Sequence, residues 1–274
     1  MGLPDFVKPP VNEVALGVQF EPLTSVSNAR VCTLWSALYR DEYPLSEEVP
    51  PLDPVEERFG VPAPRAVRLQ LQAGPPVPRY WFKNEDETEL VQIQHDRFVR
   101  NWRRRQTGSA YPRYEALRDR MLEQFSQFCD YAEKEDMGTV KPNQVEVSYI
   151  NDLAAGDGWD SFGELEKAIN VWRGEFSDGF LPQPEEVRCA MSFVIHDGAE
   201  KAIGRLHVNV EPRLRMDDGQ RILRLSLTAR GAPIGASIDG VRAFLEIGHE
   251  WVVKGFVSVT TPAMHKVWER TNDR

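Results

Sequence analysis

Apolar and polar residues alternate strictly along several short segments of this chain, and this alternation constrains the fold more than any other feature. In the segment 13–20, for example, Val14, Leu16, Val18 and Phe20 occupy every second position. Successive side chains of a β-strand point to opposite faces of the sheet, so the pattern predicts a strand with one buried face and one polar face. Antiparallel sheets of such strands commonly leave one face open to solvent or to a partner.

The same alternation, bounded by turn residues, predicts further strands, and apolar residues three and four positions apart predict helices. The expected strands are 13–20, 65–72, 79–83, 89–94, 97–103, 145–151, 187–196, 203–211 and 221–229. The expected helices are a short one capped by Ser27, a long one over 112–134, a short one opened by the capping box of Ser161 and Glu164, a long one capped by Ser237, and a last one started by Thr261 and Pro262.

These elements follow a similar order in the two halves of the chain. Residues 1–142 are expected to form a β-α-β4-α half, and residues 143–274 a β-α-β3-α half with a terminal helix. The expected fold class is therefore α+β, with antiparallel sheets covered by long helices. Its shape is similar to the saddle of the TATA-box-binding protein and to helix-grip folds, a likeness that carries no function.

The segment 41–64 is rich in proline and acidic residues and predicts an extended surface loop that wraps the body. We interpret it as a passive, solvated connection. The alternative is an acidic docking segment.

Charge and cysteine content limit the class of protein. The formal net charge of -9 argues against a generic coating of DNA or anionic lipid, which needs a broad positive field. Cys32, Cys129 and Cys189 are widely spaced and lie in apolar patterns, which is typical of reduced core thiols in a cytoplasmic protein. The first residues do not resemble a signal peptide, and no apolar run is long enough to span a membrane, so a cytoplasmic location without membrane contact is expected.

Known catalytic signatures are missing from the sequence, including a Walker P-loop, a G-x-S-x-G elbow, H-E-x-x-H and C-x-x-C. We therefore expect no enzyme, no cofactor and no metal site. Of the histidines, His249 and His265 are interpreted as helix-surface or capping residues. Cys189 shares the apolar phase of its strand, so a nucleophilic role is not expected.

Two features indicate a binding surface instead. Hydrogen-bonding and basic side chains occupy the polar phase of the strands, so the uncovered sheet face is the best candidate for a partner site, although outer faces are also polar simply because they meet water. In addition, arginines are interleaved with Phe98 and Trp102 over 97–105 and are followed by Tyr111, Arg113 and Tyr114, a combination that can contact phosphates and stack bases. The alternative is that both aromatics enter the core while the arginines pair with the acidic segment 41–57. The residues expected to bind a partner are Arg68, Gln92, Gln94, Arg97, Arg100, Arg103, Arg104, Arg105, Arg188, Arg205, His207 and Arg224.

Several motifs together resemble a sporadically distributed prokaryotic family of uncharacterised proteins. The resemblance spans essentially the whole chain and rests on PPVNEVALGVQF, Tyr43-Pro44, LVQIQHDRFVRNWRR, YPRYEALRDRM, VSYINDL and HEWVVKGFVSVTTPAMHKVWER. It implies no established activity and no catalytic residues. The patchy distribution of that family implies accessory genes of mobile or defence-type clusters.

Three hypotheses of function follow. The first is a non-enzymatic binding or regulatory protein that acts through protein contacts. The second is an accessory protein that binds RNA or DNA with the segment 97–105. The third is an enzyme or small-ligand receptor with a cavity between the sheet and a long helix. No feature of the sequence indicates an oligomeric state.

Overall fold

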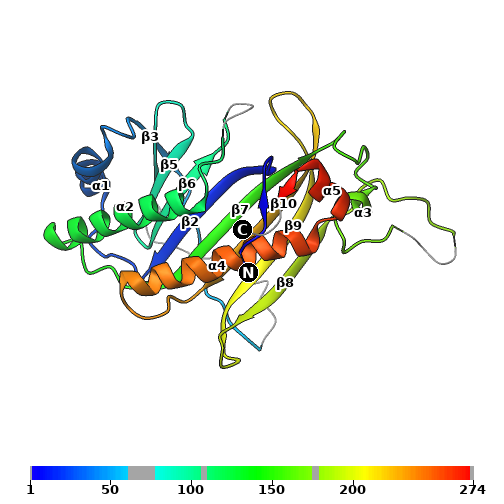
Figure 1. Cartoon of the computed structure of the whole chain (residues 1–274). Coiled ribbons are helices and arrows are strands. Elements are labelled where there is room, and N and C mark those ends of the chain that lie inside the picture. Colours follow the sequence, from blue (N-terminus) through cyan, green and yellow to red (C-terminus); the bar gives the residue numbers. More distant parts are fainter. Residues whose placement is uncertain (1, 61–77, 106–109, 175–178, 272–274) are drawn as a thin grey trace.

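A computed structural model describes residues 2–60, 78–105, 110–174 and 179–271 of the chain (Figure 1). Within these ranges nine strands form one antiparallel sheet in the order β3-β4-β5-β6-β2-β7-β10-β9-β8. The strands are β2 (Val11–Phe20), β3 (Leu45–Val49), β4 (Arg79–Lys83), β5 (Glu89–Gln94), β6 (Arg97–Arg103), β7 (Pro142–Ala154), β8 (Cys189–His196), β9 (Ala202–Leu214) and β10 (Arg221–Gly231). The fold is therefore α+β and is dominated by a large antiparallel sheet.

The centre of the sheet joins segments that are far apart in the sequence. Strand β2 pairs with β7, so that Val14 lies opposite Tyr149 and Val18 lies opposite Val145. Strand β6 flanks β2 on one side, and β10 flanks β7 on the other. The pairing of β2 with β7 therefore joins the strands on either side of it into one continuous sheet.

The helices α2 (Tyr114–Lys134) and α4 (Ile238–Val259) lie across the same face of this sheet (Figure 1). The shorter helices are α1 (Asn28–Leu34), which continues into the π-helical turn η1 (Trp35–Tyr39), α3 (Leu165–Ala168) and α5 (Pro262–Val267). None of the helices in the described ranges is both long and apolar enough to cross a bilayer.

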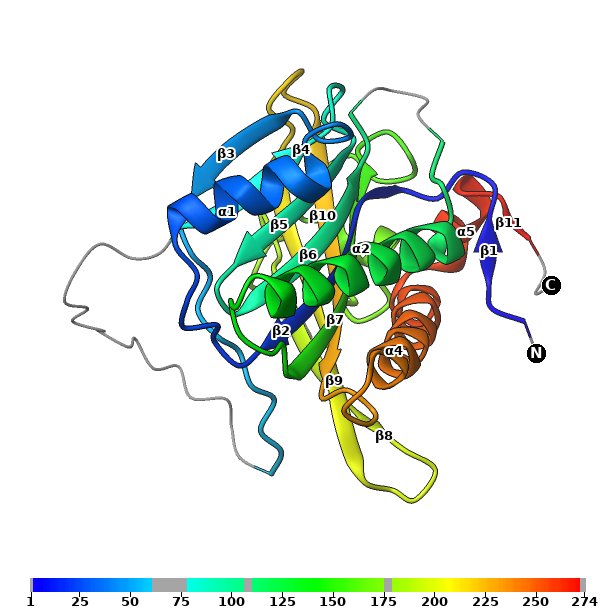
Figure 2. The same ribbon diagram turned by 90° about the vertical axis from the view of Figure 1, so that its left-hand side faces the viewer.

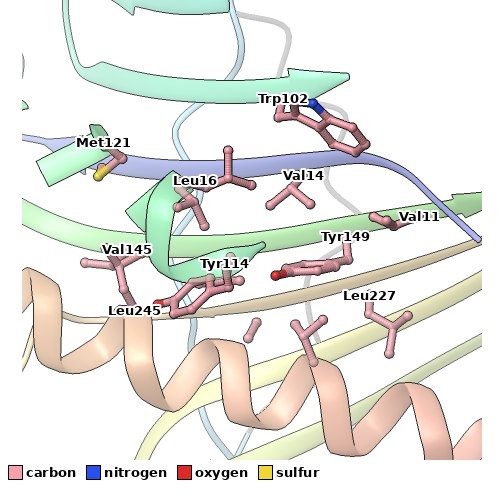
Figure 3. Packing of buried hydrophobic residues seen from close by; sticks show 14 of the residues in the cluster. Val11, Val14, Leu16, Trp102, Tyr114, Met121, Val145, Tyr149, Leu227 and Leu245 are labelled. Carbon is pink, nitrogen blue, oxygen red and sulfur yellow. The ribbon is translucent and has the colours of Figure 1, made fainter. Parts of the chain in front are cut away.

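The core fills the space between these helices and the sheet. Val14 and Leu16 of β2, Met121 of α2, Leu227 of β10 and Leu245 of α4 all belong to this core, with at most 1% of their surface exposed (Figure 3). Burying each such aliphatic side chain contributes roughly 1.5–3 kcal/mol. The apolar phase predicted for the strands is therefore the phase that packs beneath the helices.

Glycines allow α4 to approach the sheet closely. A Cβ atom placed on Gly231 of β10 would lie 2.2 Å from the carbonyl oxygen of Ile203 and 2.5 Å from Cε2 of Phe244, which belongs to α4. The ring of Phe244 thus occupies the volume that a side chain at Gly231 would need.

The two ends of the described chain lie side by side. Strands β1 (Asp5–Phe6) and β11 (Arg270–Thr271) form a separate antiparallel pair (Figure 2). The ring of Phe6 packs edge-on against Phe256 of α4 and Trp268, with centroid distances of 5.5 and 6.1 Å. These contacts place the N-terminal segment beside the C-terminal end of α4.

The structure confirms the strands predicted from alternation, with identical bounds for β4, β5 and β6. The strand expected at 65–72 lies outside the described residues. Strand β3 falls in the segment that was expected to be a loop. The helix expected from Ser161 is wrong in extent, because only the four residues of α3 are helical; the capping interaction itself exists, since the amide of Ser161 donates to Glu164 Oε2 over 3.3 Å.

Candidate functional site

The face of the sheet opposite the helices is partly covered by the chain itself. Residues 50–60, which we call the strap, lie across this face from β5 to β9. The amide of Leu52 donates to Gln94 Oε1 and its carbonyl accepts from Gln94 Nε2, both over 2.9 Å. Val55 makes the same pair of bonds with Gln19 of β2, at 2.8 and 3.0 Å. Glutamine side chains of the strands therefore hold the strap as a further extended segment.

Glu57 fixes the far end of the strap. Its carboxylate is 5% exposed and contacts Arg205 and His207 of β9, with His207 Nε2 2.7 Å from Oε1, and Arg230 of β10 at 3.6 Å. Burial raises the pKa of Glu57, but the hydrogen bond to His207 and the charges of Arg205 and Arg230 outweigh this effect, so the pKa lies below its usual value. The guanidinium of Arg205 also lies 5.2 Å from the centre of the Phe59 ring.

The interpretation of this segment as a passive, solvated connection is therefore wrong for the strap. The backbone of the strap bonds to side chains of β5, β2 and β6, and Glu57 contacts side chains of β9 and β10, so the strap is not exposed to solvent alone. Phe98 and Trp102 are buried, as one of the two interpretations of the arginine-rich segment predicted. Its other part, that the arginines pair with the acidic segment 41–57, is wrong: Arg97 donates to the backbone carbonyl oxygen of Asp53, and the carboxylates that pair with Arg103 and Arg105 are Glu13 and Glu87.

The predicted partner-binding residues are dispersed by the structure. Gln92 and Gln94 are buried, and Arg97 lies beneath the strap. Arg68 lies outside the described residues. Arg100 requires a correction, because it points to the helix-covered face, is 4% exposed, and bonds to Glu89 at 2.6 Å and to Gln124 Oε1 at 3.1 Å. A partner could reach Arg100 only if α2 were displaced.

Most of the other predicted arginines already pair with carboxylates of this chain. Bonds of 2.8–3.2 Å join Arg103 to Glu13, Arg105 to Glu87, Arg188 to Glu186 and Arg224 to Asp152. Arg104 donates instead to the carbonyl oxygen of Pro9. The surface that these side chains form is consequently close to electrically balanced. That it binds a partner stays a prediction.

A cavity of about 490 Å³ lies on the helix-covered side, and none of the residues predicted to bind a partner lines it. Four parts of the chain line it: the N-terminal segment 3–11, the residues from Tyr111 to Glu115 that lead into α2, the end of β7, and the stretch of α4 from His249 to Phe256. We call it the tyrosine cavity. Its size falls within the range of roughly 300–1,000 Å³ that is usual for small-molecule sites.

A chain of hydrogen bonds runs along the wall of the tyrosine cavity. The hydroxyls of Tyr111 and Tyr149 are 2.7 Å apart, and the hydroxyl of Tyr149 lies 3.2 Å from Nδ1 of His249. The ring of Tyr114 stacks on the imidazole with a centroid distance of 3.7 Å and an angle of 5°. In Figure 3, Tyr114 and Tyr149 lie between the sheet and α4.

Burial keeps the side chains of this hydrogen-bonded chain uncharged. Desolvation, helped by the charge of Arg118, lowers the pKa of His249 to about 4. Desolvation raises the pKa of both Tyr111 and Tyr149 above the usual value for a phenol. At neutral pH the wall therefore offers hydroxyl donors and acceptors and a neutral imidazole.

Arg113 lies at the edge of the cavity in an unusual backbone conformation. Its φ of 71° and ψ of 156° fall in a region that almost only glycine adopts, at a cost on the order of 1–3 kcal/mol. Its guanidinium pairs with Asp5 over 2.5 Å, and half of its side chain is exposed. Strain of this kind clusters at functional sites, because it holds a side chain in one direction.

The sequence-based interpretation of His249 as a helix-surface residue is wrong. His249 follows Leu245 by four positions and precedes Val252 by three, so it lies on the buried stripe of α4, and this spacing was the available signal. Tyr111 was part of the arginine- and aromatic-rich signal, whereas nothing marked Tyr149, because a phenol ring at such a position is equally typical of a core.

No family model, curated protein or solved structure matches this chain. Among the described residues, no group of three or more histidine, cysteine, aspartate or glutamate side chains is arranged to hold a metal ion.

Proposed function

We propose that this protein is a receptor for a small organic ligand, which it binds in the tyrosine cavity. The observation that carries the proposal is a cavity of ligand size in which a neutral hydrogen-bond chain and a strained arginine converge among apolar walls. This is the arrangement that small-molecule sites commonly show: mostly apolar lining with a few placed polar groups.

The lining indicates the chemistry of the ligand. Phe6, Val252 and Phe256 offer apolar surface, and Tyr149 and His249 offer hydrogen bonds from uncharged groups. Arg113 adds one cation at the edge, where a carbonyl or carboxylate could replace its contact with Asp5. We therefore infer a ligand with an apolar, ring-sized body and a single polar or acidic end.

The chemistry of the wall supports binding rather than catalysis. A general base works best when its pKa lies near the working pH, whereas the pKa of His249 is about 4 and the tyrosines stay protonated. These groups can hold and orient a ligand, but they exchange protons poorly at neutral pH.

A displacement assay tests the proposal. The probe is an anilinonaphthalene sulfonate dye, which has an apolar body and one anionic end, and mass spectrometry of the native protein searches for a co-purified compound. The variant Val253→Trp fills the cavity from α4 and is expected to abolish dye binding. Tyr149→Phe removes the hydroxyl without changing the shape of the cavity wall and is expected to weaken binding about fivefold, since a hydrogen bond to the ligand contributes about 1 kcal/mol.

Tyr131→Phe serves as the matched control, because Tyr131 lies on α2 outside the cavity lining. Equal dye binding by the wild-type protein and Val253→Trp would place the dye elsewhere and refute the receptor proposal. The same result follows if neither form binds the dye and no compound co-purifies.

A second candidate function is contact with another macromolecule through the end of the sheet that the strap leaves uncovered. Asn209, Glu211 and Arg224 lie on this part of β9 and β10, and no contact with the strap involves them. A pull-down with and without nuclease separates a protein partner from a nucleic acid. The position of the gene in a mobile or defence-type cluster is likewise a proposal, which its neighbouring genes would test.

The order of elements also supports a proposal on the finer fold. From β2 to α2 the order is β-α-β4-α, from β7 to α4 it is β-α-β3-α, and the two opening strands pair with each other. We infer two related halves with a saddle-like or helix-grip-like arrangement.

A further inference from the structure

A second cavity, of about 120 Å³, lies between the strap and the sheet. Leu52 and Val55 of the strap form its roof, and Gly17 of β2 leaves room in its floor. Arg79 of β4 and Arg97 of β6 line its wall. Because a water molecule takes up roughly 30 Å³, the cavity has room for one small polyatomic ion or a few waters.

The two arginines lie in one row across neighbouring strands. Tyr80 pairs with Ile93, and Gln94 pairs with Arg97, so Arg79 and Arg97 flank Gln94 on the same face. Arg79 donates to Gln92 Oε1 over 2.9 Å, and Arg97 donates to Gln19 Oε1 over 2.7 Å. Both partners are neutral amides.

Neither guanidinium has a carboxylate within 4 Å among the residues that the structure describes. In addition, the Nε atom of each is buried and has no hydrogen-bond partner in that part of the chain. Buried polar groups in folded proteins are normally paired, and an unpaired buried charge is costly. Desolvation lowers the pKa of Arg79 and of Arg97, and the charge of Arg97 lowers that of Arg79 further.

The carboxylate that lines this cavity is already engaged. Glu146 lines the cavity, but it lies 2.6 Å from Nη2 of Arg230. Asp96, whose charge raises the pKa of Arg97, accepts instead from Nε2 of Gln94 over 2.8 Å, so in the described part of the chain no carboxylate bonds directly to either guanidinium. Arginine suits phosphate and sulfate in particular, because its planar fork matches two of their oxygens.

We propose that the cavity beneath the strap binds one free tetrahedral oxyanion, phosphate or sulfate, between Arg79 and Arg97. The anion brings a negative charge into direct contact with both guanidinium groups and accepts hydrogen bonds from the two Nε groups. Since the strap forms the roof, the bound ion also holds the strap against the sheet. The site is separate from the tyrosine cavity, which lies on the other face of the sheet.

Isothermal titration with inorganic phosphate, at an ionic strength held constant with chloride, tests the proposal. One binding site per chain is expected for the wild-type protein, together with a rise in Tm. Arg79→Met is expected to weaken phosphate binding at least tenfold, whereas Arg213→Met changes an exposed arginine outside the cavity and is expected to bind like wild type.

Arg79→Met also tests the charge argument directly. Removing a half-buried cation that has no carboxylate partner is expected to leave the Tm in chloride unchanged or higher, while a purely structural arginine would lower it. If Arg79→Met does not fold, Arg79→Lys keeps the charge but loses the fork, and a tenfold weaker binding is again expected.

Two further arms separate the remaining explanations. Glycerol 3-phosphate is expected to bind much more weakly than free phosphate, because the strap leaves no space for the glycerol; equal affinities would overturn the assignment to a free ion. Val253→Trp, which fills the tyrosine cavity, is expected to retain full phosphate binding. The receptor proposal and the phosphate proposal can therefore fail independently of each other. Wild-type protein without phosphate or sulfate binding at millimolar concentration would refute the site.

Discussion

The buried imidazole of His249 is expected to make folding stability depend on pH. Its pKa is 6.5 in the unfolded chain and about 4 in the folded protein, because burial disfavours the charged form. Above pH 6.5 both states hold the neutral ring, and stability is complete. As the pH falls from 6.5 to 4 the unfolded state gains a proton that the folded state refuses, so the free energy of unfolding decreases. The full loss is about 3 kcal/mol, at roughly 1.4 kcal/mol for each pKa unit.

The assay compares the wild-type protein with His249→Phe, which keeps a flat ring against Tyr114 but cannot titrate. Urea unfolding at pH 7 and at pH 4.5 gives the change in free energy for each form. At pH 4.5 the His249 contribution amounts to about 2–3 kcal/mol, and the wild-type protein is expected to lose that much more than His249→Phe. Carboxylates such as Glu57, whose pKa lies below its usual value, also lose stabilisation in acid, but they do so equally in both forms.

His196→Gln is the matched control, because His196 is an exposed histidine at the end of β8. This variant is expected to follow the wild-type pH dependence. Equal losses for wild type and His249→Phe between pH 7 and pH 4.5 would show that His249 titrates normally, and would refute the burial argument. A titration of the imidazole resonances by NMR measures the same pKa directly.

Three other substitutions test separate features of the structure. Arg113→Gly is expected to be more stable than Arg113→Ala by about 1–3 kcal/mol in thermal unfolding, because only glycine adopts the observed φ and ψ without strain; equal stability would remove the strain argument. Glu57→Gln is expected to cost about 1–3 kcal/mol and to expose the strap to limited proteolysis, since a charged partner of two arginines is lost. Gly231→Ala is expected to cost about 1–3 kcal/mol through clashes with the carbonyl oxygen of Ile203 and the ring of Phe244, whereas Gly198→Ala, with open space around it, is expected to stay within about 0.5 kcal/mol by the usual scale of surface changes; the same Tm for both would contradict the close packing at Gly231.

Alternation predicted the strands well, because it is a local property of each strand that is buried on one face. It could not predict β3, whose sequence LSEEV is almost entirely exposed and whose place depends on backbone pairing with β4. Arg100 shows the opposite case. It shares its phase with Phe98 and Trp102, so alternation placed it on the buried face, while its charge favoured the surface. Glu89 on the neighbouring strand provides the counter-charge that makes the buried position stable.

The two cavities could not be predicted from the sequence for a related reason. The tyrosine cavity depends on contacts between Tyr111, Tyr149 and His249, which belong to three elements far apart along the chain. The strap depends on Glu57 meeting Arg205, 148 residues later. Residue types and spacing indicate which side chains are polar or basic, but they do not indicate which of these meet after the sheet has formed.

The pairing of β2 with β7 has a consequence for synthesis on the ribosome. Val14 pairs with Tyr149, which is synthesised about 130 residues later. The edge of β2 that pairs with β7 therefore has no partner until the first half of the chain has been made. An unpaired strand edge is a template for aggregation. The nascent chain is therefore expected to need protection by a chaperone until residues 142–154 emerge, and a stop introduced just before Pro142 is expected to yield insoluble protein.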